Sequence, residues 1–407
     1  MRKLLFLFLG VCCCVSLQAQ VTHLFEHTYP AVEEEHPQIR TLMNKVSIDS
    51  LAATLDHLQS YHTRRWDSRM VYEVQDWLFD QYREMDFDTV YLHDFLALYH
   101  DTLYETSDNV IAVRKGLLYP DEYVVCGAHY DSYNMFEGHP DSLRAPGADD
   151  NASGVSGIME TARILKDCTF ERSVIFCNFA AEEIGLLGSA AYAKECAEQY
   201  MDIVAYFNLD MIGYLEEGSD IHVKLLYTGR DSLLANYVYD FCRTYYPDME
   251  ISHGWLSGGS DSDFSSFNRN GYQAVHPFED THHYSPYIHT PDDIVGLSVN
   301  SMEQVKRFTE LNLGFVATLA GLISNGVEDH KDSPLIVYPN PVTESFTVKG
   351  VPIREVSVYN LMGQRLVSHS FFGEECRMDV SFLVPGIYFI QVLQEDGMVF
   401  TEKLIKN

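Results

Sequence analysis

The feature that most constrains the fold is a series of apolar runs separated by segments of helix length. The runs VIFCNF (174–179) and IVAYFNLDMI (203–212) are almost continuously apolar. Such runs are typical of strands that are buried on both faces of a sheet. Further strands are predicted at about 88–98, 108–114 and 122–128. Strands of this kind require helices on both sides of the sheet to cover them.

Helical periodicity fills the intervals between these strands. Two helices are predicted before the first strand, and Ser47 and Ser68 are candidate N-caps for them. The predicted helices span approximately 47–62, 68–85, 151–167, 186–198, 231–246 and 301–323. The alternation predicts an α/β fold with a central mixed β-sheet flanked by helices.

The pattern of the chain changes after Ile323. Residues 325–334 are polar and contain Gly and Pro, which is typical of a linker. From 335 to 407 the sequence consists of short strand-like segments separated by turns, with no helical pattern. This predicts a separate, small C-terminal all-β sandwich.

The N-terminus has the pattern of a signal peptide. Arg2 and Lys3 precede an apolar run from Leu4 to Leu17, and Ala19 provides a small residue before a cleavage point. The run is short for a membrane span, and no stop-transfer pattern follows it. We therefore expect a signal peptide at 1–19, a main domain at 20–324 and no integral membrane span in the mature chain.

The charge balance excludes some classes of partner. The chain has 28 Lys and Arg against 59 Asp and Glu, a net charge of −31. A chain this acidic is a poor partner for nucleic acid or for an anionic membrane surface. Its content of 46% hydrophobic residues is that of a globular protein rather than a disordered one.

Acidic residues and histidines follow several of the buried strands directly. Zinc is bound by His, Asp, Glu or Cys, and in open α/β sheets such side chains lie at the carboxyl ends of strands. A single strand-end Asp is more often a cap, so the joint pattern is what indicates a metal site. The candidates are His129 and Asp131 in EYVVCGAHYDS (122–132), Asp149 and Asp150 in PGADDNASG (146–154), Glu182 and Glu183 in VIFCNFAAEEIGLLGS (174–189), Asp210 in YFNLDMIGY (206–214) and His289 in YSPYIHTPDD (284–293).

These motifs, in this order, resemble the bacterial leucyl aminopeptidase family of di-zinc exopeptidases. The likeness covers about 105–323 and includes the segment at 262–280. It implies a secreted metallo-aminopeptidase that hydrolyses N-terminal residues from peptides and binds two Zn²⁺ ions per chain. One carboxylate can bridge two ions about 3.5–4 Å apart, because it has two oxygens. In the family pattern Asp149 would be this bridge, His129 and Asp210 would complete one ion, and Glu183 and His289 would complete the other.

The resemblance also assigns two residues to the catalytic chemistry. Glu182 would be the general base, taking a proton from the attacking water and delivering it to the leaving amine. Asp131 would lie behind His129 and fix its tautomer. The family further implies a cis peptide bond between Asp149 and Asp150.

The chain departs from the family in two respects, and other functions remain open. The family often has His after the Ser-Asp pair, whereas here Phe264 follows Asp263, and no close Cys pair precedes that segment. Both differences put substrate preference in doubt. The main alternative is a glutaminyl-peptide cyclotransferase, which uses one zinc on the same scaffold. Cyclases tend to carry an insertion after the glutamate, but EEIGLLGS (182–189) is uninterrupted. A non-catalytic binding module, a carboxypeptidase and a dipeptidase are the remaining alternatives.

The C-terminal segment has a resemblance of its own. YPNP (338–341), YNLMGQ (359–364) and GIYFIQV (386–392) are similar to the C-terminal sorting domains of type IX secretion cargo in Bacteroidetes. This resemblance implies that the type IX secretion machinery is a partner. The protein would then be secreted or placed on the cell surface, by way of the periplasm. The alternative is an accessory sandwich that binds carbohydrate or a neighbouring protein.

Overall fold

The computed structural model describes residues 23–255, 262–324, 335–360, 364–394 and 399–407. The signal peptide predicted at 1–19 and the linker predicted at 325–334 lie outside these residues. The chain divides into two compact units, Met1–Gly326 and Val327–Asn407. The division falls inside the predicted linker, and each unit is described by itself.

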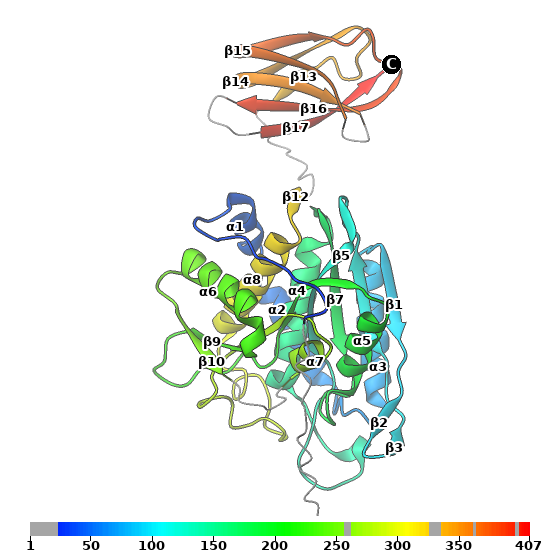
Figure 1. Ribbon diagram of the computed structural model, residues 1–407, viewed down its shortest axis with the longest axis vertical. Coiled ribbons are helices and arrows are strands. Elements are labelled where there is room, and N and C mark those ends of the chain that lie inside the picture. Colours follow the sequence, from blue (N-terminus) through cyan, green and yellow to red (C-terminus); the bar gives the residue numbers. More distant parts are fainter. Residues whose placement is uncertain (1–22, 256–261, 325–334, 361–363, 395–398) are drawn as a thin grey trace, which may run out of the picture. The chain divides into compact units, whose positions relative to one another are not determined.

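The first unit is built on one mixed sheet of eight strands (Figure 1). In spatial order the strands are β1 (Thr89–His93), β4 (Asn109–Arg114), β7 (Arg172–Phe179), β5 (Tyr119–His129), β8 (Asp202–Asn208), β11 (Ala274–Phe278), β9 (His222–Tyr227) and β10 (Glu250–Trp255). The run β7-β5-β8-β11 is parallel, whereas the pairs β1·β4, β4·β7 and β11·β9 are antiparallel. Two small sheets pair β2 (Ala97–Tyr99) with β3 (Thr102–Tyr104) and β6 (Thr169–Phe170) with β12 (Leu322–Ser324). The predicted strand at 88–98 is therefore β1 followed by the start of β2.

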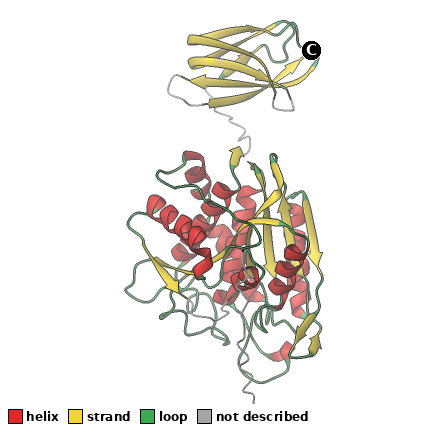
Figure 2. Ribbon diagram, viewed as in Figure 1, coloured by secondary structure: helices red, strands yellow, loops and turns green. Residues whose placement is uncertain are grey.

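Helices cover both faces of this sheet, as Figure 2 shows. They are α1 (Pro37–Met43), α2 (Ile48–Ser60), α3 (Met70–Glu84), α4 (Gly154–Leu165), α5 (Leu187–Glu198), α6 (Ser232–Tyr245), α7 (Phe264–Arg269) and α8 (Met302–Leu319). Side chains of α1 to α4, α6 and α8 share one buried cluster with Val110 and Val124, and those of α5 and α7 share another with Ile111 and Val125. Neighbouring residues of one strand thus enter opposite layers, as a strand buried on both faces requires.

The helix starts agree only in part with the sequence prediction. Ser47 caps α2, because its side chain accepts a hydrogen bond from the Ser50 backbone N–H. Ser68 does not cap α3, which begins at Met70, and the N-cap residue Arg69 makes no side-chain cap bond. Helix α1 was not predicted. It is short and has proline in its first turn, where the missing N–H costs no hydrogen bond.

The second unit consists entirely of antiparallel strands among its described residues. They are β13 (Ile336–Tyr338), β14 (Ser345–Tyr359), β15 (Arg365–Asp379), β16 (Gly386–Gln394) and β17 (Val399–Lys406). The order is β13-β14-β16-β17, and β15 pairs with β14. Alternate residues such as Phe346, Val348 and Ile390 form its core. The predicted fold class, an α/β core followed by a small all-β unit, is confirmed.

The topology brings the carboxyl ends of β5, β7 and β8 to one edge of the sheet. These three strands are adjacent and parallel. His129 is the last residue of β5, and β8 ends at Asn208, four residues before the predicted end. The early end of β8 leaves Asp210 in a loop beyond the sheet.

None of the helices among the described residues combines the length and the apolar character that a membrane span needs.

Candidate metal centre

The first half of the site forms around the imidazole of His129. Its Nε2 lies 3.2 Å from Asp150 Oδ1 and 3.4 Å from Asp210 Oδ1. The three side chains come from the end of β5, the loop before α4 and the loop after β8. His129 is 1% exposed, so this group of ligand-type atoms is shielded from bulk water.

The second half of the site forms around His289, on the loop between β11 and α8. Its Nε2 lies 3.0 Å from Asp150 Oδ2 and 3.0 Å from Glu183 Oε2. The two oxygens of the Asp150 carboxylate therefore face two different histidines. This is the arrangement that a carboxylate shared between two metal ions requires.

The structure corrects the bridging assignment of Asp149. Among the described residues, the groups of side chains close enough to share a metal ion include Asp150 but not Asp149. Asp149 Oδ1 instead accepts a hydrogen bond from Gly213 N–H at 2.8 Å. The cis peptide bond is also one residue later than expected, between Asp150 and Asn151. Asp149 thus contacts the backbone beyond Asp210, while Asp150 lies between the two halves of the site.

Glu182 and Asp131 lie beside the ligand-type residues. Ligand atoms of Glu182, His129 and Asp210 all lie within 4.8 Å of one another. His129 Nδ1 lies 3.2 Å from the Asp131 backbone oxygen and 3.5 Å from its Oδ1. Asp131 Oδ1 and Oδ2 also accept the backbone N–H groups of Glu182 and Glu183, at 3.0 and 3.3 Å. Asp131 therefore orients the imidazole and holds the loop after β7.

Two more carboxylates, which were not predicted, hold the loops of the site. The carboxylate of Asp293 accepts the N–H groups of Asp149 and Asp150, at 2.8 and 3.1 Å. Glu279 accepts those of Tyr214 and Ser285, at 2.8 and 3.2 Å. Each carboxylate fixes backbone close to a ligand-type residue.

Three residues at the site have backbone in an unfavourable conformation. Ala181, Met211 and His289 have φ values of 53°, 55° and 58°, in the left-handed region that non-glycine residues seldom adopt. Ala181 precedes Glu182 and Met211 follows Asp210. Conformations of this kind persist where the surrounding structure over-determines them, and they cluster at functional sites.

Asp210 has two further partners that the sequence indicated only as part of a Ser-Asp segment. Ser262 Oγ donates to Asp210 Oδ2 at 2.6 Å, and His276 Nε2 lies 2.9 Å from the Asp210 carbonyl oxygen. Phe264, which departs from the family pattern, is buried and contacts the ring of His276 at a centroid distance of 5.7 Å. Phe264 thus lies next to a residue that contacts Asp210.

Burial and mutual repulsion change the protonation of the acidic groups. Burial raises the pKa of Glu183 to about 8, and Asp150 adds to the shift. Burial likewise raises the pKa of Asp263 to about 7 and that of Glu279 to about 8. Burial alone would lower the pKa of His289, but Asp150 and Glu183 raise it to about 11. These buried carboxyl groups therefore favour the protonated form unless a nearby cation balances their charge.

The donor set fits zinc. It contains imidazole nitrogens and carboxylate oxygens, which are the ligands that Zn²⁺ takes in catalytic sites. Asp210 Oδ1 and Glu183 Oε1 are buried and have no hydrogen-bond partner among the described residues. Buried polar atoms are normally satisfied, and a bound cation would satisfy these two.

An apolar pocket of about 370 Å³ adjoins the first half of the site. Its lining residues are Asp210, Met211, Leu226, His276, Phe278, Thr281, Tyr284 and Ile288. The pocket begins at a candidate metal ligand and is otherwise mostly apolar. It can therefore hold an apolar side chain next to the ligand-type atoms.

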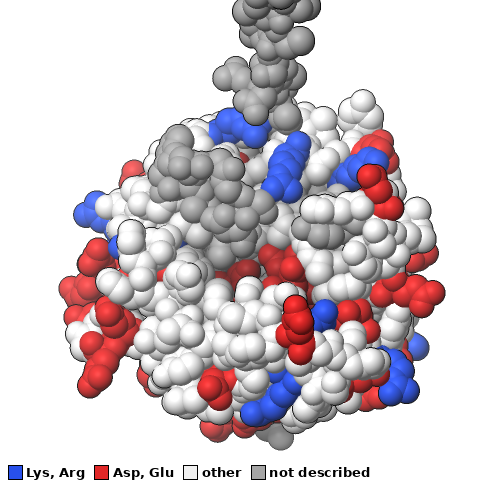
Figure 3. Space-filling view, turned by 90° about the horizontal axis from the view of Figure 1, so that it is seen from below, with Lys and Arg blue, Asp and Glu red and all other residues white. Residues whose placement is uncertain are grey.

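The face of the first unit on which β5 ends carries acidic side chains, with basic ones among them (Figure 3). Seen from below, on the side where β5 ends, Asp and Glu side chains lie near the centre of the face and along its rim (Figure 3).

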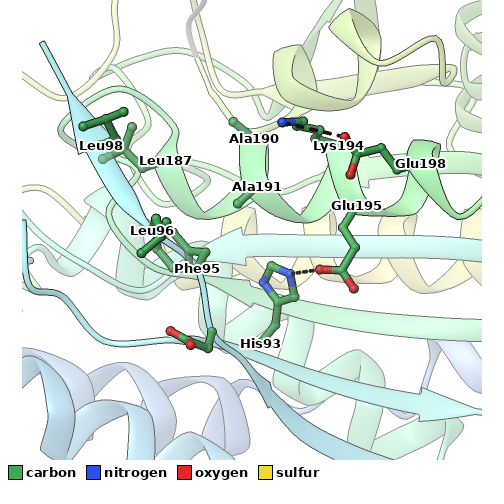
Figure 4. A pocket seen from close by; sticks show the side chains of 11 residues that line it. His93, Phe95, Leu96, Leu98, Leu187, Ala190, Ala191, Lys194, Glu195 and Glu198 are labelled. Atoms are coloured by element: carbon green, nitrogen blue, oxygen red, sulfur yellow. Dashed lines mark hydrogen bonds and ion pairs between the residues drawn. The ribbon is translucent and has the colours of Figure 1, made fainter. Parts of the chain in front are cut away.

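Another open pocket, of about 460 Å³, lies between the segment after β1 and helix α5 (Figure 4). Its lining includes His93, Leu96 and Glu195 but none of the candidate metal ligands. It is separate from the metal centre.

The fold and this site define the class of the protein. Histidines and carboxylates at the carboxyl edge of an open α/β sheet, around one shared carboxylate, are the framework of a metal-dependent hydrolase. The chain matches the model of Peptidase family M28 over residues 109–313. The chain belongs to Peptidase family M28, and it is a hydrolase of the zinc aminopeptidase class.

Curated relatives and solved structures agree with this assignment. The chain is 29% identical over 326 residues to Leucine aminopeptidase 1 of Fusarium vanettenii, covering 75% of this chain and 79% of that protein. It is 30% identical over 312 residues to Leucine aminopeptidase 1 of Aspergillus fumigatus, covering 72% and 76%. The crystal structure of the LapA aminopeptidase of Legionella pneumophila matches with a TM-score of 0.60 and 26% identity, covering 73% of this chain and 78% of that one.

The second unit matches a different family model. Residues 336–407 correspond to a secretion system C-terminal sorting domain. The second unit is therefore a C-terminal sorting domain, as the sequence indicated.

Proposed function

We propose that the protein removes N-terminal residues from peptides with a water molecule activated by two zinc ions. The observation that supports this most directly is the position of Asp150, whose two oxygens face His129 and His289 at 3.2 and 3.0 Å. His129, Asp150 and Asp210 would hold one ion, and Asp150, Glu183 and His289 would hold the other. When bound, zinc lowers the pKa of water and polarises the scissile carbonyl group.

Side chains of the protein would accept and deliver the proton that the reaction transfers. Glu182 lies beside His129 and Asp210 and is not required as a ligand. It can accept the proton of the attacking water and deliver it to the leaving amine. Asp131 holds Glu182 in place by accepting its backbone N–H, and it orients His129 at the same time.

The apolar pocket next to Asp210 favours substrates with a large apolar N-terminal side chain. Met211, Leu226, Phe278 and Ile288 would contact such a side chain, and its burial removes apolar surface from water. The two relatives named Leucine aminopeptidase 1 agree with this preference.

A panel of aminoacyl reporter amides tests the reaction and the preference together. We expect leucyl and phenylalanyl amides to be cleaved with kcat/KM at least about tenfold above the glycyl amide, since each buried methylene adds selectivity. N-acetylated versions of the same amides should resist cleavage, because an aminopeptidase acts beside a free amino group. Zinc counted per chain in the same preparation should be close to two.

The same panel separates the alternatives. Cleavage of the N-acetylated amides would indicate a different peptidase. The glutaminyl cyclase of Bacteroides thetaiotaomicron shares this fold, at 18% identity and a TM-score of 0.54. Conversion of an N-terminal glutamine peptide to its cyclic form, with one zinc per chain and no amide cleavage, would identify a cyclotransferase.

We propose further that the chain reaches the periplasm with its N-terminal signal and that the sorting domain then directs it across the outer membrane. All candidate site residues lie in the first unit, so the second unit is not needed for catalysis. A chain truncated after Gly326 and expressed in its native host should retain peptidase activity and accumulate in the periplasm. Normal amounts of the truncated enzyme in the medium or on the cell surface would assign an accessory role to the second unit.

A further inference from the structure

The segment between α2 and α3 is hydrogen-bonded to two loops of the site. One is the loop after β5, which directly follows His129, and the other is the loop before α4, which carries Asp150. Arg64 N–H donates to Ser132 Oγ at 3.0 Å, and Ser132 N–H donates to the Arg64 carbonyl at 3.3 Å. Ala145 N–H donates to the His62 carbonyl at 3.0 Å, and Ser132 Oγ donates to the Ala145 carbonyl at 2.8 Å. The segment around Arg64 is thus hydrogen-bonded both to the loop after β5 and to the loop before α4.

The side chain of Arg64 also bonds to both of these loops. It is 0% exposed. Its Nε donates to the Tyr130 carbonyl at 2.9 Å and its Nη2 to the Gly147 carbonyl at 2.8 Å. Its Nη1 donates to the carbonyls of Leu58 and Pro146. All four acceptors are backbone oxygens, so the planar guanidinium fixes the path of the chain rather than one opposing charge.

The loop before α4 is shaped to admit this guanidinium. Gly147 has a φ of 52°, and a Cβ there would lie 2.8 Å from Arg64 Nη2. The same Cβ would lie 2.4 Å from the Asp150 carbonyl oxygen and 2.6 Å from Ser132 Cβ. Glycine is the residue that allows both the left-handed backbone and the close approach of the arginine.

We propose that Arg64 is a positioning residue for metal binding, an inference that rests on the proposed function. Tyr130 directly follows His129, and Gly147 precedes Asp150 by three residues. By bonding to both carbonyls, the guanidinium sets the separation between the His129 imidazole and the Asp150 carboxylate, which lie 3.2 Å apart. The guanidinium of Arg64 bonds to backbone carbonyls and to none of the candidate ligand side chains. It would act through the backbone next to His129 and Asp150.

The test replaces Arg64 by Lys in the full-length chain and measures zinc retained per chain against a graded chelator. Lysine keeps the charge and loses the planar fork. We expect zinc affinity to fall about 10- to 100-fold, as for other residues that support ligands. At saturating zinc we expect a lower kcat and a nearly unchanged KM, because the substrate pocket is untouched. Arg64→Gln, measured in parallel, should lose at least as much.

Val238→Ala is the matched control. Val238 is a fully buried residue of α6, a helix that packs against α8 and β9 to β11, so this variant should melt at a lower temperature and keep its zinc affinity. If Arg64→Lys and Arg64→Gln melt at lower temperatures but bind zinc like the wild type, the role is structural and the proposal is wrong. Normal affinity in Arg64→Lys together with loss in Arg64→Gln would assign the effect to charge and also overturn it. A wild-type chain that binds no zinc would instead refute the proposed function.

Discussion

Replacing Asp150 by Asn is expected to remove both zinc ions and reduce peptidase activity to background. An amide has one oxygen and no charge, so it cannot serve as the shared ligand between His129 and His289. Each half of the site would lose a ligand at once. Elemental analysis of the purified variant should therefore give close to zero zinc per chain rather than one.

The neighbouring residue provides the control for this experiment. Asp149→Asn retains a side-chain oxygen that can accept the hydrogen bond from Gly213 N–H, so this variant should keep both ions and most of its activity. The zinc content of the two variants thus shows which of the two adjacent aspartates binds the metal ions. The reverse result, with zinc lost in Asp149→Asn and kept in Asp150→Asn, would restore the assignment that the sequence suggested.

Replacing Glu182 by Gln should have the opposite signature, because the metal stays and the chemistry is lost. General acid–base catalysis contributes about 10²- to 10⁴-fold, and we expect kcat to fall by that factor with zinc content unchanged. Glu183→Gln is the comparison, since it removes a ligand to the ion at His289 and should lower zinc content.

Two outcomes would contradict the role of Glu182. Near-normal turnover at full zinc occupancy would show that another group accepts the proton of the water. Loss of zinc in Glu182→Gln would identify the residue as a ligand instead, which its position beside His129 and Asp210 would permit.

The sequence predicted the fold well because burial on both faces leaves a clear pattern. The near-continuous apolar runs correspond to β7 and β8, and the amphipathic segments correspond to α2 to α6 and α8. The start of α3 was misplaced, because Ser68 has the side chain of a cap but its backbone N–H turns back to the Arg65 carbonyl. Nothing in residue type alone distinguishes these two uses of a serine.

The site could be predicted only as far as the strand ends fix it. His129 follows from the end of β5, but the loop from Gly147 has no regular periodicity, so the sequence could not decide which of Asp149 and Asp150 faces the histidines. Asp293 and Glu279 were missed for a related reason. They accept hydrogen bonds from backbone N–H groups, and every residue except proline has one of these. The residue types of their partners therefore do not identify such contacts in the sequence.

The attachment of the ligand loops has a consequence for protein engineering. The carboxylates of Asp131, Asp293, Asp149 and Glu279 all accept hydrogen bonds from main-chain N–H groups. A library that varies the apolar positions of the neighbouring pocket would therefore leave the anchoring points of the catalytic frame intact. If the pocket binds substrate as proposed, its lining could be changed without altering these hydrogen bonds, which is what directed evolution of a new cleavage preference needs.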